Sequence, residues 1–304
     1  MIRIHDIAYV RFGAPDLDAM ERFTTAFGFV TSQRSDERLF VRGTDPSAYV
    51  HVTERGAPGF RGVAFQAASA DDLAAAARLP GASGVESLEG PGGGACVRFV
   101  DPDGNPVEVV HGREEVEPLP VRSAAPLNVG TARRRLGALQ RIEAGPAQVK
   151  RLGHCVFFVS DFAKSEAWYK DRFGFLDSDR ITLGGPDQVL AAFMRCDRGA
   201  QHTDHHTLLC AQLGEPRFDH AAFEVEDFDA LMVGHEHLAA GGDYEHHAGV
   251  GRHIAGSQIF DYWRDPFGHV VEHFTDGDLL DASTPAGLVD PGTALGTQWG
   301  KFQP

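Results

Sequence analysis

Short runs of apolar, β-branched and aromatic residues recur along the chain, and each has the length of a single strand. The run at 5–11 (HDIAYVR) resembles the run at 154–160 (HCVFFVS). Each run leads into an amphipathic stretch, at 15–30 and at 160–176, whose apolar residues are spaced as on one face of a helix. The pattern therefore predicts a strand followed by a helix at two places, and Gly174 is placed to end the second helix in a left-handed turn.

The remainder of this unit also occurs twice. The segment FRGVAFQAASADDLAAAA (60–77) matches FDHAAFEVEDFDALMVGH (218–235), and FVDPDGNPVEVVHG (99–112) matches YWRDPFGHVVEHFTDG (262–277). The offset between matching segments increases slowly along the chain, as expected when a module is duplicated and the second copy gains loop insertions. We therefore expect an α+β fold in which a strand, a helix and several further strands are repeated in tandem.

The pattern divides the chain into four parts. We expect an N-terminal module over 1–115, a linker over 116–150, a C-terminal module over 151–278 and a tail over 279–304. The linker is rich in Pro, Ala, Glu and Arg, and a short helix is expected in it around 130–142. The tail has no clear periodicity, so we expect it to pack as irregular chain over the second module.

The composition is that of an ordinary globular protein, with 304 residues, 42% of them hydrophobic and 23% charged. This length suits about two domains. The net charge of −15 argues against general nucleic-acid binding, because an acidic surface repels phosphates. No apolar run approaches the ~18 residues of a membrane span, and the start of the chain lacks a secretory signal pattern. The four cysteines form no CxxC pair and suit reduced thiols. We expect a cytoplasmic protein that binds neither nucleic acid nor membrane.

Three potential metal ligands occur on predicted strands of the second copy: His154, His220 and Glu272. Two imidazoles and one carboxylate on one face of an octahedral ion form the facial triad of non-haem Fe(II), which leaves three adjacent positions open. In the first copy we take the matching residues to be His5, Gly62 and Glu108, so that a glycine replaces the second histidine. A lone histidine and glutamate make a poor metal site, so the first module is expected to hold no metal.

These features resemble those of a known family. The segments DHHTL (204–208) and GRHIAGSQIFDYW (251–263), together with the three ligands, resemble type I extradiol ring-cleavage dioxygenases (catechol 2,3-dioxygenase-like) of the vicinal oxygen chelate, or glyoxalase–bleomycin resistance, superfamily. The resemblance covers residues 1–277 and implies modules of paired βαβββ units forming a curved, incompletely closed mixed sheet barrel. FMRCDRG (193–199) and QWG (298–300) are most similar to the subgroup that acts on single-ring catechols bearing a carboxylate or alkyl group.

The resemblance implies an Fe(II)-dependent enzyme of aromatic catabolism, with Mn(II) as the other suitable metal. It would insert both atoms of O₂ into a substituted catechol and open the ring beside the diol, giving a muconic semialdehyde-type product. Tyr262 would hydrogen-bond the catechol oxygen that ionises, His253 would contact the same region and take a proton, and His206 would face dioxygen as a general acid. Arg252, as a partner for a substrate carboxylate, and His247 are expected near the substrate.

Most of the remaining histidines are expected to have no part in the site. His205 should point away from its neighbour His206, because successive residues of a strand face opposite sides. His51, in the first module, and His235 and His246, in the second, are interpreted as surface residues, with an approach of His246 to the pocket as the alternative.

Two other function classes share this fold. A metal-dependent glyoxalase-like lyase or isomerase is disfavoured by Gly62 and by the presence of His206, His253 and Tyr262. A non-catalytic small-molecule-binding protein is disfavoured by the intact set of three ligands, which binding alone does not need. Because repeats of this kind expose sheet edges between modules, we also expect a homo-oligomer, either a dimer or a tetramer.

Overall fold

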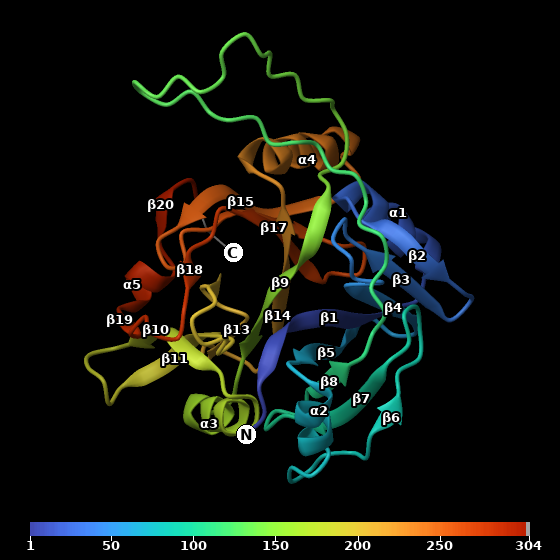
Figure 1. Cartoon of the computed structure of the whole chain (residues 1–304), viewed down its shortest axis with the longest axis vertical. Coiled ribbons are helices and arrows are strands. Elements are labelled where there is room, and N and C mark those ends of the chain that lie inside the picture. Colours follow the sequence, from blue (N-terminus) through green and yellow to red (C-terminus); the bar gives the residue numbers. More distant parts are fainter. Residues whose placement is uncertain (302–304) are drawn as a thin grey trace.

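The computed structural model describes residues 1–301 and, within them, places the N-terminal module on an open mixed sheet (Figure 1). The strand order across this sheet is β2-β3-β4-β1-β5-β8-β7-β6. The strands are β1 (Ile4–Ala14), β2 (Val30–Arg34), β3 (Arg38–Arg42), β4 (His51–Arg55), β5 (Gly59–Ala67), β6 (Glu86–Ser87), β7 (Ala95–Val100) and β8 (Pro106–His111).

The C-terminal module repeats this sheet and adds a strand at each edge. Its order is β19-β10-β11-β13-β9-β14-β17-β16-β15-β20, and without the two outer strands it matches the first sheet position by position. The strands are β9 (Val149–Phe158), β10 (Leu176–Thr182), β11 (Val189–Arg195), β13 (Leu208–Ala211), β14 (Arg217–Val225), β15 (Glu245–His253), β16 (Ile259–Arg264), β17 (Val270–Thr275), β19 (Gly287–Val289) and β20 (Thr297–Trp299). The predicted two-module α+β fold is thus confirmed.

The helices are α1 (Leu17–Phe27), α2 (Ala70–Ala76), α3 (Phe162–Phe173), α4 (Phe228–Gly241) and α5 (Pro291–Ala294). The first long helix of each module begins after an aspartate, Asp16 or Asp161, whose carboxylate accepts backbone N–H groups of the first turn. Each ends at a glycine in the left-handed conformation, Gly28 or Gly174, as predicted for Gly174. No helix in residues 1–301 combines the length and apolar composition needed to cross a membrane.

A continuous apolar core joins the two modules. Its largest cluster contains Phe12 and Phe65 from the first module and Phe157 and Phe223 from the second. Polar contacts cross the same boundary, because His273 of β17 donates from Nε2 to the carbonyl oxygen of Phe27 at 2.7 Å. Apolar packing and this hydrogen bond therefore fix the position of the second module against the first.

The linker contains no helix in the structure, so the helix predicted around 130–142 was wrong. The segment projects as a long loop beyond α4 (Figure 1). Leu136 and Leu139 are almost fully exposed, and Gly130 and Gly137 adopt positive φ angles. A short helix gains most of its stability from packing an apolar face, and here no surface is available to cover the leucines.

The tail is also more ordered than predicted. After the short strand β18 (Leu279–Leu280), which pairs with β12 (Thr203–Asp204), it forms β19, parallel to β10, and β20, antiparallel to β15. It therefore covers both edges of the second sheet instead of packing as irregular chain. Unpaired edge N–H and C=O groups accept any extended segment that reaches them, so three-residue strands form here without a periodic sequence signal.

Candidate active site

The three predicted ligands meet on one face of the second sheet. His154 on β9 and Glu272 on β17 both lie opposite Ala222 on β14, and His220 is two residues before Ala222 on the same strand. Residues two apart share a face, so the register brings all three side chains together. Nε2 of His154 and Nε2 of His220 each lie 3.3 Å from Oε2 of Glu272, and all three side chains are buried.

These side chains place three metal-type donor atoms together. Nε2 of His154, Nε2 of His220 and Oε2 of Glu272 are buried and face one another. Nδ1 of His220 donates to Oδ2 of Asp219 at 2.9 Å, and this outer hydrogen bond orients the ring so that Nε2 faces Glu272. Although burial alone would raise it, hydrogen bonding and charge from His154 and His220 hold the pKa of Glu272 well below its usual value. An N₂O donor set of this kind fits the facial triad.

A cavity of about 550 Å³ opens in front of this cluster. His206, His253 and Tyr262 line it together with His154 and His220, and most of its remaining wall is apolar. Tyr262 lies opposite Glu272 in the β16–β17 ladder, which places its side chain on the same face. Its hydroxyl is 3.1 Å from Nε2 of His253. The ring centre of His206 lies 4.1 Å from that of His154.

A chain of three polar side chains ends at His206. Nε2 of His205 contacts Oδ2 of Asp179 at 2.9 Å, and Nδ1 of His205 contacts Nδ1 of His206 at 3.1 Å. A carboxylate only accepts, so His205 carries its proton on Nε2 and must accept at Nδ1. His206 then donates from Nδ1 and keeps Nε2 unprotonated. His205 is not among the residues that line the cavity, but the predicted opposite-face arrangement was wrong, because neither histidine lies in a strand and their rings are in contact. Sequence reasoning missed that His205 orients His206.

The prediction that Arg252 lies near the substrate was wrong. Its guanidinium pairs with Asp276 at 2.7 Å, donates to the carbonyl oxygen of Ser257, and is not among the groups that line the cavity. His247 does line the cavity, and its Nδ1 contacts Nη2 of Arg264 at 3.2 Å. Sequence reasoning missed the two arginines that line the cavity, Arg217 and Arg264. Arg264 lies two residues after Tyr262 in one strand, and this spacing could have identified it.

The first module has a tyrosine, not His5, at the position of His154. Tyr9 and Glu108 both lie opposite Ala64, as His154 and Glu272 lie opposite Ala222. The hydroxyl of Tyr9 donates to Oε2 of Glu108 at 2.6 Å, whereas His5 is exposed near the start of β1. The match with His5 was therefore wrong.

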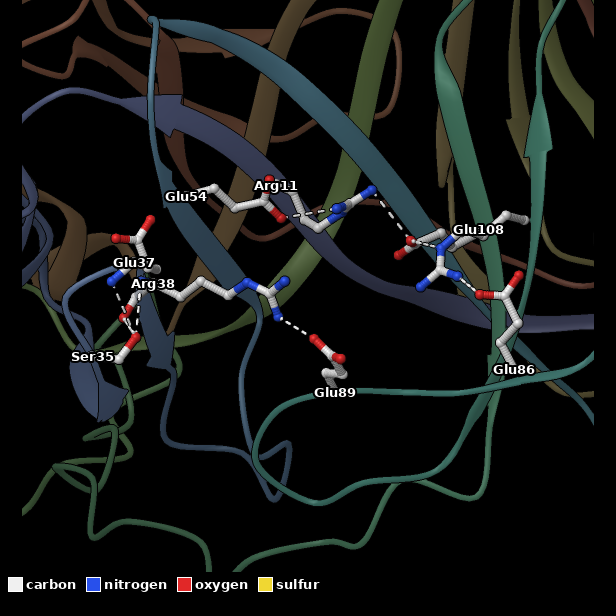
Figure 2. Close-up of polar contacts among 9 residues, drawn as sticks. Arg11, Ser35, Glu37, Arg38, Glu54, Glu86, Glu89 and Glu108 are labelled. Atoms are coloured by element: carbon white, nitrogen blue, oxygen red, sulfur yellow. Dashed lines mark hydrogen bonds and ion pairs between the residues drawn. The ribbon is translucent and has the colours of Figure 1, made fainter.

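Two arginine side chains lie beside Glu108, where the second module has the histidines that neighbour Glu272. Figure 2 shows Arg11 between Glu54 and Glu108, with Nη1 2.9 Å from Glu54 and Nη2 3.2 Å from Glu108. Gly62 does match His220, and a Cβ atom there would lie only 2.9 Å from Nη2 of Arg11. Nε of Arg98 donates to Glu108 at 3.1 Å. Two guanidinium groups thus balance the charge of the carboxylate, and these ion pairs stand where the second module has its two histidines and glutamate.

Comparisons with known proteins agree with this geometry. Residues 151–273 match the family model described as Glyoxalase/Bleomycin resistance protein/Dioxygenase superfamily. Metapyrocatechase 2 of Cupriavidus necator is 32% identical over 306 residues, covering 99% of this chain and 90% of that protein. The chain belongs to the extradiol dioxygenase family of this superfamily.

Solved structures show how widely this fold is shared beyond the extradiol dioxygenases. Homoprotocatechuate 2,3-dioxygenase from Arthrobacter globiformis has a TM-score of 0.75 at 22% identity, over 95% of this chain and 86% of that one. The Mn(II)-bound glyoxalase from Novosphingobium aromaticivorans has a TM-score of 0.78 at 22% identity, over 99% of this chain and 92% of that one. The two proteins are named for different reactions, so fold alone does not separate an extradiol dioxygenase from a glyoxalase.

Proposed function

We propose that the protein is an Fe(II)-dependent extradiol dioxygenase acting on a substituted single-ring catechol, with His154, His220 and Glu272 as the metal ligands. The observation that carries the proposal is the buried cluster of two imidazoles and one carboxylate beside a cavity lined by Tyr262 and two further histidines. Bound iron would supply a redox-capable centre between the catecholate and dioxygen. Mn(II) suits the same donors.

Tyr262 and His253 are placed to handle the first proton. Burial and the nearby Glu272 carboxylate raise the pKa of Tyr262 well above its usual value, so its hydroxyl stays protonated and can donate to an ionised catechol oxygen. Burial lowers the pKa of His253 to about 4. His253 is therefore neutral near pH 7 and can accept a proton from the catechol hydroxyl. Since the two side chains are in contact, the ionising oxygen can be held by one and deprotonated by the other.

His206 is placed to handle the second proton. Burial, followed by the charges of neighbouring histidines, lowers the pKa of His206 well below its usual value, so its resting form is neutral. The Asp179–His205 pair fixes the remaining proton on Nδ1. Nε2 can then accept a proton during the reaction and return it to oxygen when the O–O bond breaks. Both oxygen atoms enter the product, so a catechol and O₂ give one ring-opened semialdehyde with no further reactant.

The size and lining of the cavity support a single-ring substrate. About 550 Å³ accommodates a catechol with a small substituent, and the wall is formed mostly by apolar side chains such as Val156, Phe193 and Leu209. Metapyrocatechase, the relative with 32% identity, is named for catechol. Arg264 and His247, at the polar side of the cavity, would contact an anionic substituent if the substrate carries one.

Oxygen uptake by anaerobically purified, Fe(II)-loaded protein tests the proposal. The panel contains unsubstituted, 3-alkyl, 4-alkyl, carboxylated and biphenyl-type catechols, and absorbance follows the yellow product. One O₂ consumed per product formed, fastest with a single-ring catechol, is the expected result. Stoichiometric bound iron without uptake on any catechol would contradict the proposal and favour a lyase or a binding protein. We also propose a homo-oligomer, and sedimentation of only a 33-kDa species would contradict that.

A further inference from the structure

A second group of metal-type side chains lies on the outer face of the second sheet. It consists of His235 on α4, His246 on β15 and Asp261 on β16, and α4 is the helix near the top of Figure 1. Asp261 is the neighbour of Tyr262, and successive strand residues point to opposite faces. Tyr262 therefore lines the cavity, while Asp261 faces α4, where it meets His235.

The distances from the carboxylate to both imidazoles are close to those within a coordinated set. Oδ1 of Asp261 lies 2.8 Å from Nε2 of His246 and 3.2 Å from Nδ1 of His235. Ligand atoms about 2.0–2.2 Å from a tetrahedral or octahedral Zn(II) ion are separated by roughly 2.9–3.5 Å. The two ring nitrogens thus converge on one carboxylate oxygen at nearly these separations, and small side-chain rotations suffice to admit an ion between them.

The surroundings are those of a built site with an open side. The Asp261 carboxylate is completely buried, and Nε1 of Trp263 donates to its second oxygen at 2.6 Å. Such an outer hydrogen bond fixes the orientation of a ligating carboxylate. The side chains of His235 and His246 are 25% and 33% exposed, so an ion can enter from solvent and a water molecule can complete its coordination.

We propose that His235, His246 and Asp261 bind a divalent d-block cation, with Zn(II) as the best-suited ion. Two imidazoles, one carboxylate and one water form a tetrahedral set that Zn(II) accepts readily. The ligands come from three elements, so the bound ion ties α4 to the β15–β16 hairpin. The opposite face of that hairpin carries His253 and Tyr262. The site is separate from the cavity cluster and does not depend on the reaction catalysed there.

Zinc stoichiometry after equilibrium dialysis separates the two sites. Wild type is expected to bind two Zn(II) ions per chain, Glu272→Gln and His246→Gln one each, and the double variant none. His237→Gln, which removes a histidine two residues along α4 from His235, is the matched control and should still bind two. Two ions bound by His246→Gln, or one by wild type and none by Glu272→Gln, would overturn the proposal. The second of these results would leave the proposed iron site intact.

Tryptophan fluorescence gives a second readout. The ring centres of His235 and His246 lie 5.6 and 4.8 Å from that of Trp263, so a paramagnetic Ni(II) or Cu(II) ion at the site should quench this residue. The quenching should disappear in His246→Gln and persist in Glu272→Gln and His237→Gln. Trp263→Phe removes the outer hydrogen bond and should weaken Zn(II) binding roughly 10- to 100-fold. Equal quenching in all variants would show that the ion binds elsewhere.

Discussion

Replacing Glu108 by glutamine tests how the two modules divide their tasks. The carboxylate is 2% exposed, accepts hydrogen bonds from Tyr9 and Arg98, and forms an ion pair with Arg11. Glu108→Gln keeps the shape of the side chain and removes its charge. If Glu108 serves only to balance the guanidinium groups, this change must reduce stability and leave metal binding in the second module intact.

The expected size of the loss follows from the exposure of the partners. Breaking a fully buried ion pair on one side costs about 3–5 kcal/mol. The side chains of Arg11 and Arg98 are 22% and 43% exposed, and each keeps a second carboxylate, Glu54 or Glu86. Solvent and these partners offset part of the loss, so we expect the free energy of unfolding to fall by about 2–3 kcal/mol. The melting temperature should then fall by roughly 3–5 °C.

Thermal and urea unfolding of wild type and Glu108→Gln measure this loss, and metal analysis runs on the same samples. Glu272→Gln is the matched variant, because Glu272 lies at the same register position in the second module. It should lose iron and activity. Unchanged stability in Glu108→Gln, or loss of iron on that substitution, would refute the assignment of the first module to a structural role.

Three further predictions concern individual side chains. His206→Asn should retain stoichiometric iron while kcat falls by about 10²–10⁴-fold, and unchanged single-turnover kinetics would remove its role. Asp179→Asn should lower kcat, by less than His206→Asn does, with the catechol Kd unchanged, since it alters only the orientation of His206; a changed Kd with normal kcat would contradict this. Burial lowers the pKa of His51 to about 4, so the folded state binds fewer protons than the unfolded state below about pH 6.5, and stability falls as the pH drops towards 4. His51→Phe should make that fall shallower by up to about 3 kcal/mol in urea titrations at pH 4–7, and an identical slope would count against a buried neutral histidine.

The proposed metal ligands and the fold class could be inferred from sequence because their signals are local or repeated. Apolar runs and helix-ending glycines mark each strand and helix, and the duplication shows which polar residues interrupt equivalent strands. His154, His220 and Glu272 stand out in this way, and strand geometry alone then brings them together. The surface position predicted for His51 was wrong, because a strand residue at a module boundary shows no sign of burial in its own segment.

Register and long-range pairing were decided by the tertiary structure. His5 and Tyr9 are four residues apart, so simple alternation gives them the same face, and only the irregular pairing of β1 with β5 sets Tyr9 against Glu108. The edge strands of the tail depend on groups far away in the chain. The same is true of the cluster around Asp261, whose histidines come from separate elements. The periodicity of apolar residues predicts which face of a strand or helix is buried. It does not predict which distant segment packs against that face, because that depends on the tertiary fold.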